Sequence, residues 1–189
     1  MKLAKERLRK KFILIRKKNY IKSKIFNFYP IFKIIKKHFF KKRIAIAAYY
    51  PSNYEVNILK FIELALQKKL KICLPVIGLN KTMTFKSWKF KEPLYVNSFG
   101  ILEPNVSNKT VTPHLILVPL VAFDKKLNRI GYGKGYYDRY LNKIKRNNKN
   151  VVSVGIAYSF QQCSSIPTNK HDFRLDYIFT ERGIISSIK

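Results

Sequence analysis

The 189-residue chain is 47% hydrophobic and 14% aromatic, which is enough apolar material for a folded core and excludes a disordered protein. It carries 39 Lys and Arg residues against 10 Asp and Glu residues, and this net charge of +29 favours polyanionic partners such as nucleic acids. Its two cysteines, Cys73 and Cys163, lie far apart without neighbouring Cys or His ligands. A disulfide scaffold and a zinc finger are therefore excluded, and a reducing compartment is expected.

Residues 1–43 hold a large share of the positive charge, with 17 basic residues and one acid. The spacing of apolar residues predicts an amphipathic helix over 3–18 and further helix over 19–43, broken at Pro30. Because 30 of the 39 basic residues in the chain are Lys, a biased composition also explains the charge, and a surface built for bidentate phosphate contacts would use more Arg. An RNA- or ribosome-associated arm over 1–43 and a membrane-surface role for 19–43 are the alternatives.

Strand and helix patterns alternate in the next part of the chain. The run 43–50 is typical of a buried strand, residues 58–66 place apolar side chains on one helical face, and 71–77 is again typical of a strand. A strand, a helix and a second strand in this order are typical of neighbouring parallel strands. Short strands or a hairpin are expected over 83–88 and 94–96, in the less regular segment that follows.

The alternation continues in the second half of the chain. Residues 115–121 are apolar enough for a buried central strand. A loop over 122–135, a helix over 136–146, and strands over 151–158 and 176–180 are expected after it.

This pattern predicts the fold class α/β: a single three-layer α/β/α domain over residues 1–189, built around a mainly parallel sheet. The basic segment 1–43 is expected to pack on this domain or to flank it. No apolar run approaches the roughly 20 residues of a transmembrane helix. The four apolar residues 12–15 behind the basic N-terminus are too few for a signal peptide. We expect a cytoplasmic protein without a membrane span.

The segment 123–138 concentrates residues that suit phosphate binding. It holds three of the seven glycines within five positions and lies between a predicted strand and a predicted helix. Glycine lets backbone N–H groups face an anion, and a helix N-terminus adds donors. Arg129 and Lys134 add positive charge, and Asp138 adds a carboxylate for a bridging cation. The spacing GxGxG is neither Walker A nor the Rossmann fingerprint, so a plain basic connection between strand and helix is the alternative.

The stretch VPLVAFDKKLNRIGYGKGYYDRYL, residues 118–141, resembles the signature of the 5-formyltetrahydrofolate cyclo-ligase family, also called methenyltetrahydrofolate synthetases. Other motifs resemble that family in the family's order: KERLR at 5–9, YYPSNYEVNI at 49–58, GILEP at 100–104 and HDFRLDYIFTERG at 171–183. The resemblance covers nearly the whole chain. It implies an enzyme that converts 5-formyltetrahydrofolate to 5,10-methenyltetrahydrofolate through a phosphorylated formyl intermediate, while ATP is hydrolysed to ADP and phosphate with Mg²⁺.

The resemblance also implies roles for individual residues. ATP would bind at Lys5, Arg9, Arg129, Ile130, Gly131, Tyr132, Gly133, Lys134, Gly135, Tyr136 and Tyr137. The folate substrate would bind at Tyr50, Glu55, Tyr132, Gly133, Lys134, Gly135 and Tyr136. Mg²⁺ would bind at Asp138 and Asp176. The resemblance further implies small-molecule substrates, no specific nucleic-acid partner and a monomer.

Several of these residues have plainer explanations. Lys5 and Arg9 belong to a segment crowded with basic residues. Glu55 lies in the first turn of a predicted helix, where an acid often only complements the helix dipole. Asp176 is also explained as a turn residue at the start of a strand.

Two positions depart from the family pattern. His114 stands where the family commonly has an acidic residue, and Leu120 stands where it commonly has Gly. The Leu120 side chain either crowds the site or is absorbed by the core. A protein that binds folate or nucleotide without turnover is therefore a third interpretation.

Overall fold

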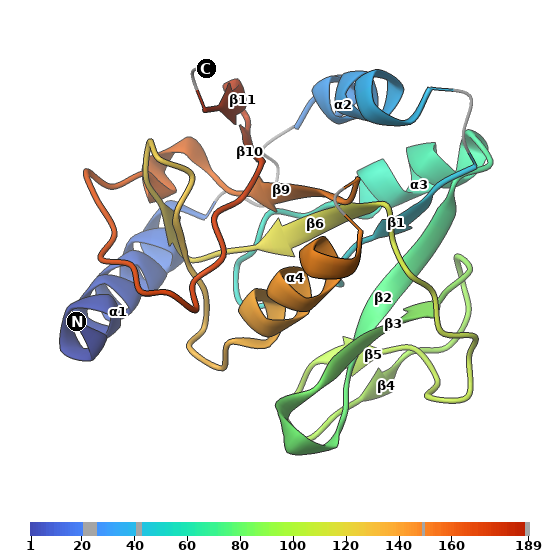
Figure 1. Ribbon diagram of the computed structural model, residues 1–189, viewed down its shortest axis with the longest axis horizontal. Coiled ribbons are helices and arrows are strands. Elements are labelled where there is room, and N and C mark those ends of the chain that lie inside the picture. Colours follow the sequence, from blue (N-terminus) through green and yellow to red (C-terminus); the bar gives the residue numbers. More distant parts are fainter. Residues whose placement is uncertain (21–25, 41–42, 149, 188–189) are drawn as a thin grey trace.

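The computed structural model describes residues 1–20, 26–40, 43–148 and 150–187. The strands of its main sheet are β1 (Ala45–Ala47), β2 (Lys71–Ile77), β3 (Met83–Ser87), β6 (Leu115–Pro119), β9 (Val152–Ile156), β10 (Tyr177–Thr180) and β11 (Gly183–Ser186). Their order is β11-β10-β9-β6-β1-β2-β3 (Figure 1). The inner strands from β10 to β2 run parallel, and the two edge strands β11 and β3 are antiparallel.

Two small sheets and the helices complete the described part of the chain. The small sheets pair β4 (Tyr95–Val96) with β5 (Leu102–Glu103), and β7 (Ala122–Phe123) with β8 (Arg129–Ile130). The α-helices are α1 (Lys2–Asn19), α2 (Tyr29–Phe39), α3 (Leu59–Gln67) and α4 (Tyr136–Asn147). Two short 3-10 turns are η1 (Leu79–Lys81) and η2 (Ser159–Gln161).

Helices cover both faces of the main sheet. Ile31 of α2 and Phe61 of α3 pack in one core that includes Ile46 of β1. Ala47, the next residue along β1, packs in the second core with Leu141 of α4. Successive strand residues point to opposite faces, so one strand serves both cores. Figure 1 shows α2 and α3 on one side of the sheet and α4 on the other. The predicted α/β class with a mainly parallel sheet is confirmed.

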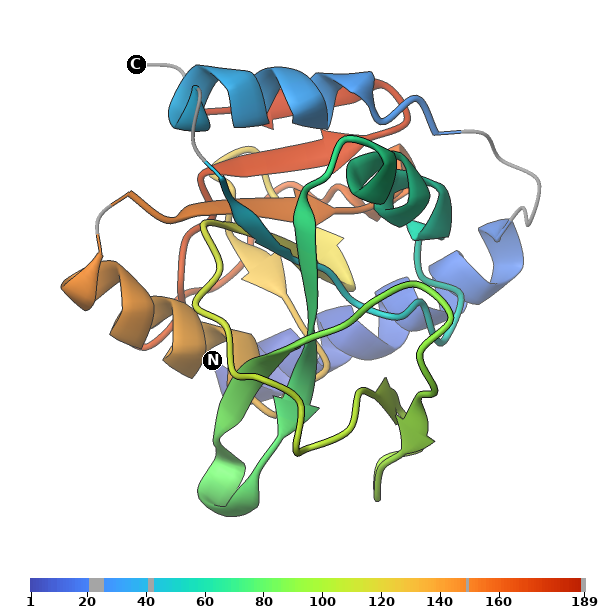
Figure 2. The same ribbon diagram turned by 90° about the vertical axis from the view of Figure 1, so that its right-hand side faces the viewer.

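Helix α1 forms a third, smaller core with the β7–β8 pair. Its residue Phe12 packs with Val121, Ala122 and Ile130. In Figure 2, α2 lies above β9 and β10, and α1 lies below these two strands. The described parts of the basic segment thus pack on the sheet and its connections, while the predicted helix over 19–43 falls partly on residues outside the described ones.

Three local expectations need correction. Pro30 does not break a helix but lies in the first turn of α2, where its missing N–H is not needed by the helical ladder. The segment 122–135 is not a plain loop, because β7 and β8 pair within it. The sequence pattern missed β11, a short edge strand. No helix among the described residues combines the length and apolar character that a membrane span requires.

Candidate functional site

A cavity of about 660 Å³ opens at the carboxyl edge of the parallel strands. Its walls include Tyr50 just after β1, Ile77 at the end of β2 and Pro119 at the end of β6. Small-molecule sites have this size, and open parallel sheets bind ligands at this edge. The cavity brings together fourteen predicted site residues: Lys5, Arg9, Tyr50, Glu55, Arg129, Ile130, Gly131, Tyr132, Gly133, Lys134, Gly135, Tyr136, Tyr137 and Asp138.

The glycine-rich connection between β8 and α4 forms one wall of this cavity. Gly133 has a φ of +94°, and a Cβ atom there would lie 3.1 Å from the guanidinium carbon of Arg9. Gly135, the residue before α4, has a φ of +68°. Both positions need glycine, because other residues rarely adopt this left-handed conformation. The connection therefore lets a cation approach the backbone closely and places the positive end of the α4 dipole at the cavity.

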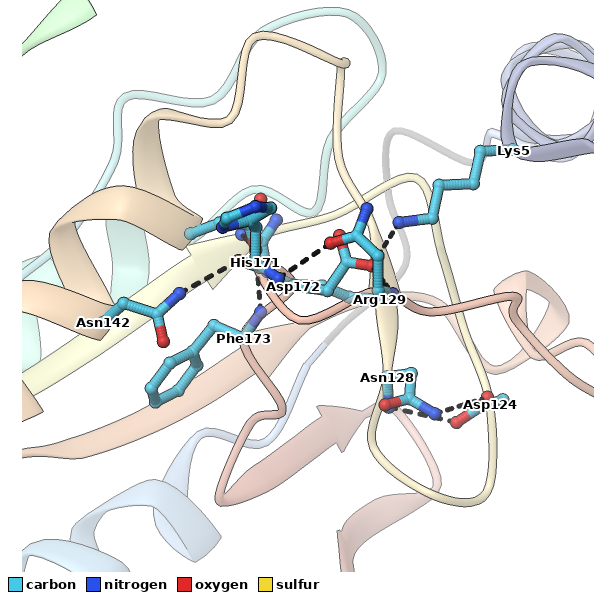
Figure 3. Close-up of polar contacts among 10 residues, drawn as sticks. Lys5, Asp124, Asn128, Arg129, Asn142, His171, Asp172 and Phe173 are labelled. Atoms are coloured by element: carbon cyan, nitrogen blue, oxygen red, sulfur yellow. Dashed lines mark hydrogen bonds and ion pairs between the residues drawn. The ribbon is translucent and has the colours of Figure 1, made fainter. Parts of the chain in front are cut away.

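Helix α1 closes the cavity from the side of the glycine-rich connection. Lys5 and Arg9, one helical turn apart, both line it. Arg9 Nε donates a hydrogen bond of 2.8 Å to the carbonyl oxygen of Gly131. Lys5 Nζ donates to the carboxylate of Asp172 (Figure 3). These two contacts bring the cations of an N-terminal helix to a site built by the middle of the chain.

Two carboxylates, Asp138 and Asp172, line the same cavity. Asp138 Oδ1 accepts a hydrogen bond of 2.8 Å from Arg129 Nη2 and one of 3.2 Å from the backbone N–H of Phe173. Because Phe173 follows Asp172 directly, the second contact holds the two acids in neighbouring positions. Figure 3 shows Lys5, Arg129 and Asp172 converging. The side chains of the two acids remain 26% and 25% exposed, so both are accessible from the cavity.

Asp176 does not reach the cavity, and its predicted pairing with Asp138 around a metal is not supported by the geometry. Its carboxylate accepts hydrogen bonds from the N–H of Ser153 at 2.8 Å and from its hydroxyl at 2.7 Å, and it lies 3.1 Å from Lys145 Nζ. Asp176 directly precedes β10, so it lies at the amino edge of the sheet, opposite the ligand-binding edge. Asp172, which lines the cavity, lies in the same motif but was not predicted as a site residue.

Glu55 is a buried acid that lines the cavity and is hydrogen-bonded to Tyr132 of the glycine-rich connection. It is 7% exposed, Oε1 accepts a hydrogen bond of 2.8 Å from the Tyr132 hydroxyl, and Oε2 accepts one of 3.0 Å from the backbone N–H of Ser52. Burial raises the pKa of Glu55, while these hydrogen bonds work in the opposite direction. The arrangement presents a fixed hydrogen-bond acceptor to a ligand.

Besides Asp172, several charged residues around this site were not predicted from the sequence, and Glu103 and Arg16 are two of them. Glu103 lines the cavity, and its Oε1 accepts hydrogen bonds from Ile77 N at 2.9 Å and Asn97 Nδ2 at 2.6 Å, while burial raises its pKa. Arg16 is 1% exposed and lies behind the glycine-rich connection. Glu103 stands in the GILEP motif, which was a usable signal, whereas nothing local distinguishes Arg16 from the other basic residues of 1–43.

The two departures from the family pattern lie outside the cavity. Leu120 is 1% exposed and packs in the core beneath α4, where its side chain faces Gly155. The Leu120 side chain therefore packs in the core and does not crowd the cavity. This removes the main argument for the hypothesis that the protein binds folate or nucleotide without turnover. His114 lies at the amino edge of the sheet, where its Nδ1 accepts a hydrogen bond of 3.2 Å from the N–H of Ala45.

The fold and the site together define a class: α/β proteins with a cation-rich, glycine-walled cavity at the carboxyl edge of a mainly parallel sheet. The family model of the 5-formyltetrahydrofolate cyclo-ligases matches residues 2–181, and the chain belongs to this family. The family membership and the enzyme class predicted from the sequence are thereby confirmed.

Individual relatives and solved structures agree with this assignment. The 5-formyltetrahydrofolate cyclo-ligase of Haemophilus influenzae is 35% identical over 136 residues, which cover 69% of this chain and 72% of the relative. A probable 5-formyltetrahydrofolate cyclo-ligase of Schizosaccharomyces pombe is 33% identical, covering 71% of this chain and 72% of its own. The structure of Aquifex aeolicus 5,10-methenyltetrahydrofolate synthetase is similar with a TM-score of 0.69 and 28% identity, covering 98% of this chain and 96% of that one. The synthetase structure from Mycoplasma pneumoniae has a TM-score of 0.66 at 25% identity, covering 94% and 98%.

Proposed function

We propose that the protein converts 5-formyltetrahydrofolate to 5,10-methenyltetrahydrofolate with ATP and Mg²⁺, and releases ADP and phosphate. The observation that carries the proposal is one cavity that joins a glycine-rich wall, approached by Arg9, to the buried acceptor Glu55. Two substrates that exchange a phosphoryl group must lie side by side, because correct placement supplies much of the rate. A shared cavity with a cationic side and a carboxylate side provides that placement.

The cationic side of the cavity suits the phosphates of ATP. Lys5, Arg9 and Lys134 line it together with the N-terminal end of α4. Phosphoryl transfer spreads negative charge over the transferred group and involves little covalent work by the protein. Fixed cations and helix-end donors around that group therefore lower the barrier by stabilising the charge.

Asp138 and Asp172 are the residues that fit a magnesium ion. No group of three or more His, Cys, Asp or Glu side chains suited to a metal occurs among the described residues. Mg²⁺ is usually held by one or two carboxylates together with substrate phosphates and water, so a pair of acids beside a phosphate site is sufficient. Asp172 forms an ion pair with Lys5, and Asp138 forms one with Arg129. When bound, the ion would neutralise phosphate charge.

The carboxylate side of the cavity suits the folate. Glu55 would accept hydrogen bonds from the N–H groups of the pterin, next to the Tyr50 ring. The formyl oxygen attacks the γ-phosphorus of ATP, forming an O–P bond while the bond to ADP breaks. N10 then attacks the activated formyl carbon and loses its proton, and phosphate leaves with the formyl oxygen. No protein nucleophile takes part, so the side chains position both substrates and neutralise charge.

The purified protein tests this proposal directly. Methenyl product should form only when 5-formyltetrahydrofolate, ATP and Mg²⁺ are all present, with one ADP and one phosphate for each product. Substrate labelled with ¹⁸O in the formyl group should transfer the label to the released phosphate. A folded preparation that forms no product, or product formed without label in phosphate, would contradict the proposal or its intermediate, respectively.

A further inference from the structure

Arg16 is a buried cation whose position the proposed reaction does not yet explain. It lies on α1, about two helical turns beyond Arg9, and only 1% of it is exposed. Its Nη1 donates to the carbonyl oxygen of Leu120 at 3.2 Å and its Nη2 donates to the Tyr132 hydroxyl at 2.5 Å. Its Nε makes no hydrogen bond within the described part of the chain. A guanidinium is costly to bury, and among the described residues no carboxylate is hydrogen-bonded to this one directly.

The nearest carboxylate in the hydrogen-bond network is Glu55, one hydroxyl away. The Tyr132 hydroxyl accepts from Arg16 and donates to Glu55 Oε1 at 2.8 Å. A phenol has a single proton, so a donor on one side directs that proton to the acceptor on the other. The Arg16 guanidinium also lies 5.5 Å from the centre of the Tyr132 ring, which restricts the position of the whole side chain. Cation, hydroxyl and carboxylate thus form a directed chain that ends in the cavity.

We infer that Arg16 is a positioning residue for folate binding, which orients the Tyr132 hydroxyl toward Glu55 and so holds the Glu55 carboxyl group at a fixed place as a hydrogen-bond acceptor. The identity of the ligand rests on the proposed function. Helix α1 then serves both substrates: Lys5 and Arg9 face the cavity as cations, and Arg16 acts from behind the glycine-rich connection.

The charges around Glu55 agree with this role. Burial raises the pKa of Glu55, and the positive charge of Arg16 opposes that effect together with the hydrogen bonds from Ser52 and Tyr132. Glu55 in turn acts on the hydroxyls of two buried tyrosines, Tyr49 and Tyr137, whose pKa values are raised first by burial and then by the negative charge of Glu55. These tyrosines therefore stay neutral, so Arg16 supplies the positive charge that favours the ionised form of Glu55.

A titration of the ligand-free protein tests the inference without relying on activity. Carbon-13 NMR of the Glu side-chain carboxyls is tractable because the chain has only 10 acidic residues, and Glu55→Gln assigns the signal. In Arg16→Met the pKa of Glu55 should rise by about one unit, and Arg16→Lys should recover part of the shift. Lys17→Met, an exposed residue of the same helix, is the matched control and should leave it unchanged. An unchanged Glu55 titration in folded Arg16→Met overturns the inference.

Kinetics provide the second measurement, and Tyr132→Phe serves if Arg16→Met does not fold. Arg16→Met should raise the KM for 5-formyltetrahydrofolate about tenfold and move the acid limb of kcat/KM to higher pH, with the KM for ATP within about twofold. Tyr132→Phe should move the same limb in the same direction. Equal changes for both substrates, or an unmoved acid limb in both variants, overturn the inference while the proposed function stands. If the wild type forms no methenyl product, the proposed function fails and the titration still decides the role of Arg16.

Discussion

The two edges of the main sheet carry similar ion pairs with different consequences. At the carboxyl edge, Asp138 accepts a hydrogen bond of 2.8 Å from Arg129, and at the amino edge Asp176 lies 3.1 Å from Lys145. The two Asp side chains are 26% and 34% exposed, so neither burial nor partner type separates them. The difference is the surrounding backbone: Asp138 lines the cavity, whereas Asp176 accepts two hydrogen bonds from Ser153 and joins β10 to β9.

Sheet polarity explains this difference. Parallel strands end on one side, so the connections that follow them converge there and enclose a space. Only at this edge do α1 and the glycine-rich connection add cations and a helix N-terminus. A carboxylate at the carboxyl edge, such as Asp138, is therefore placed to contact a ligand. A carboxylate at the amino edge, such as Asp176, stabilises the sheet.

The largest expected effect on turnover comes from replacing each of the two acids, Asp138 and Asp176, by Asn in separate variants. Asp138→Asn should lower kcat/KM about 100-fold, because a carboxylate that would hold the charge-neutralising Mg²⁺ ion is lost while the fold persists. Asp176→Asn should retain turnover within about twofold but lower the free energy of unfolding by about 1–2 kcal/mol, since buried Ser153 loses a charged acceptor. Steady-state kinetics and urea unfolding measure the two quantities.

A third variant sharpens the same comparison. Asp172→Asn should raise the Mg²⁺ concentration needed for half-maximal turnover about tenfold if two carboxylates share the ion. If Asp176→Asn loses as much turnover as Asp138→Asn, the two acids do not differ in function, and the proposed difference between the two edges is contradicted. An unaltered Mg²⁺ dependence in Asp172→Asn would leave Asp138 as the sole protein ligand.

The second prediction compares two cations on α1. Arg9→Met should raise the KM for ATP about tenfold, because a guanidinium beside phosphates makes a charge-assisted hydrogen bond. Lys17→Met removes the same charge from an exposed position of the helix and should leave this KM within about twofold. Initial rates over a series of ATP concentrations distinguish the two variants. Equal effects would mean that the general positive field, and not the position of Arg9, attracts ATP.

The third prediction compares two glycines with positive φ. Gly133→Ala should lower the free energy of unfolding by about 1–3 kcal/mol and weaken ATP binding, since its new Cβ would meet the Arg9 guanidinium in addition to the backbone strain. Gly183, the first residue of β11, has a φ of +122°, but in Gly183→Ala no atom would lie within 4 Å of the new Cβ. It should show backbone strain alone and normal nucleotide affinity. Denaturation and calorimetric titration with ATP measure both, and indistinguishable ATP affinities would contradict the role of Gly133.

The smallest expected effect lies at the amino edge and depends on pH. Burial, followed by the charge of Lys37, lowers the pKa of His38 below its ordinary 6.5, and its Nε2 lies 2.9 Å from the Tyr177 hydroxyl. The unfolded chain therefore takes up this proton at higher pH than the folded protein does. Stability should fall as the pH drops below about 6.5, and His38→Gln should show a smaller fall. Urea midpoints at several pH values test this, and identical pH dependence in both proteins would contradict it.

Local patterns predicted much of the fold. The strand at 71–77 matches β2, and the helix at 136–146 matches α4 to within one residue. The spacing of apolar residues carries this information, because each element must turn one face to a core. Boundaries were less accurate where the chain leaves the sheet to line the cavity: the strand expected over 43–50 is only β1, Ala45–Ala47. Pairing partners decide where such a strand ends, and they lie far away in the sequence.

The sequence by itself determined the α/β class, the glycine-rich wall and fourteen of the residues that line the cavity, because these depend on short motifs and on local periodicity. The tertiary structure alone showed that Asp172, and not Asp176, lines the cavity. It also showed that the Leu120 side chain is buried in the core and that Arg16 is hydrogen-bonded to Tyr132. These outcomes depend on which sheet edge a residue reaches and on which distant segment packs against it. Contacts between residues 16 and 132, or 5 and 172, join segments that no local pattern connects.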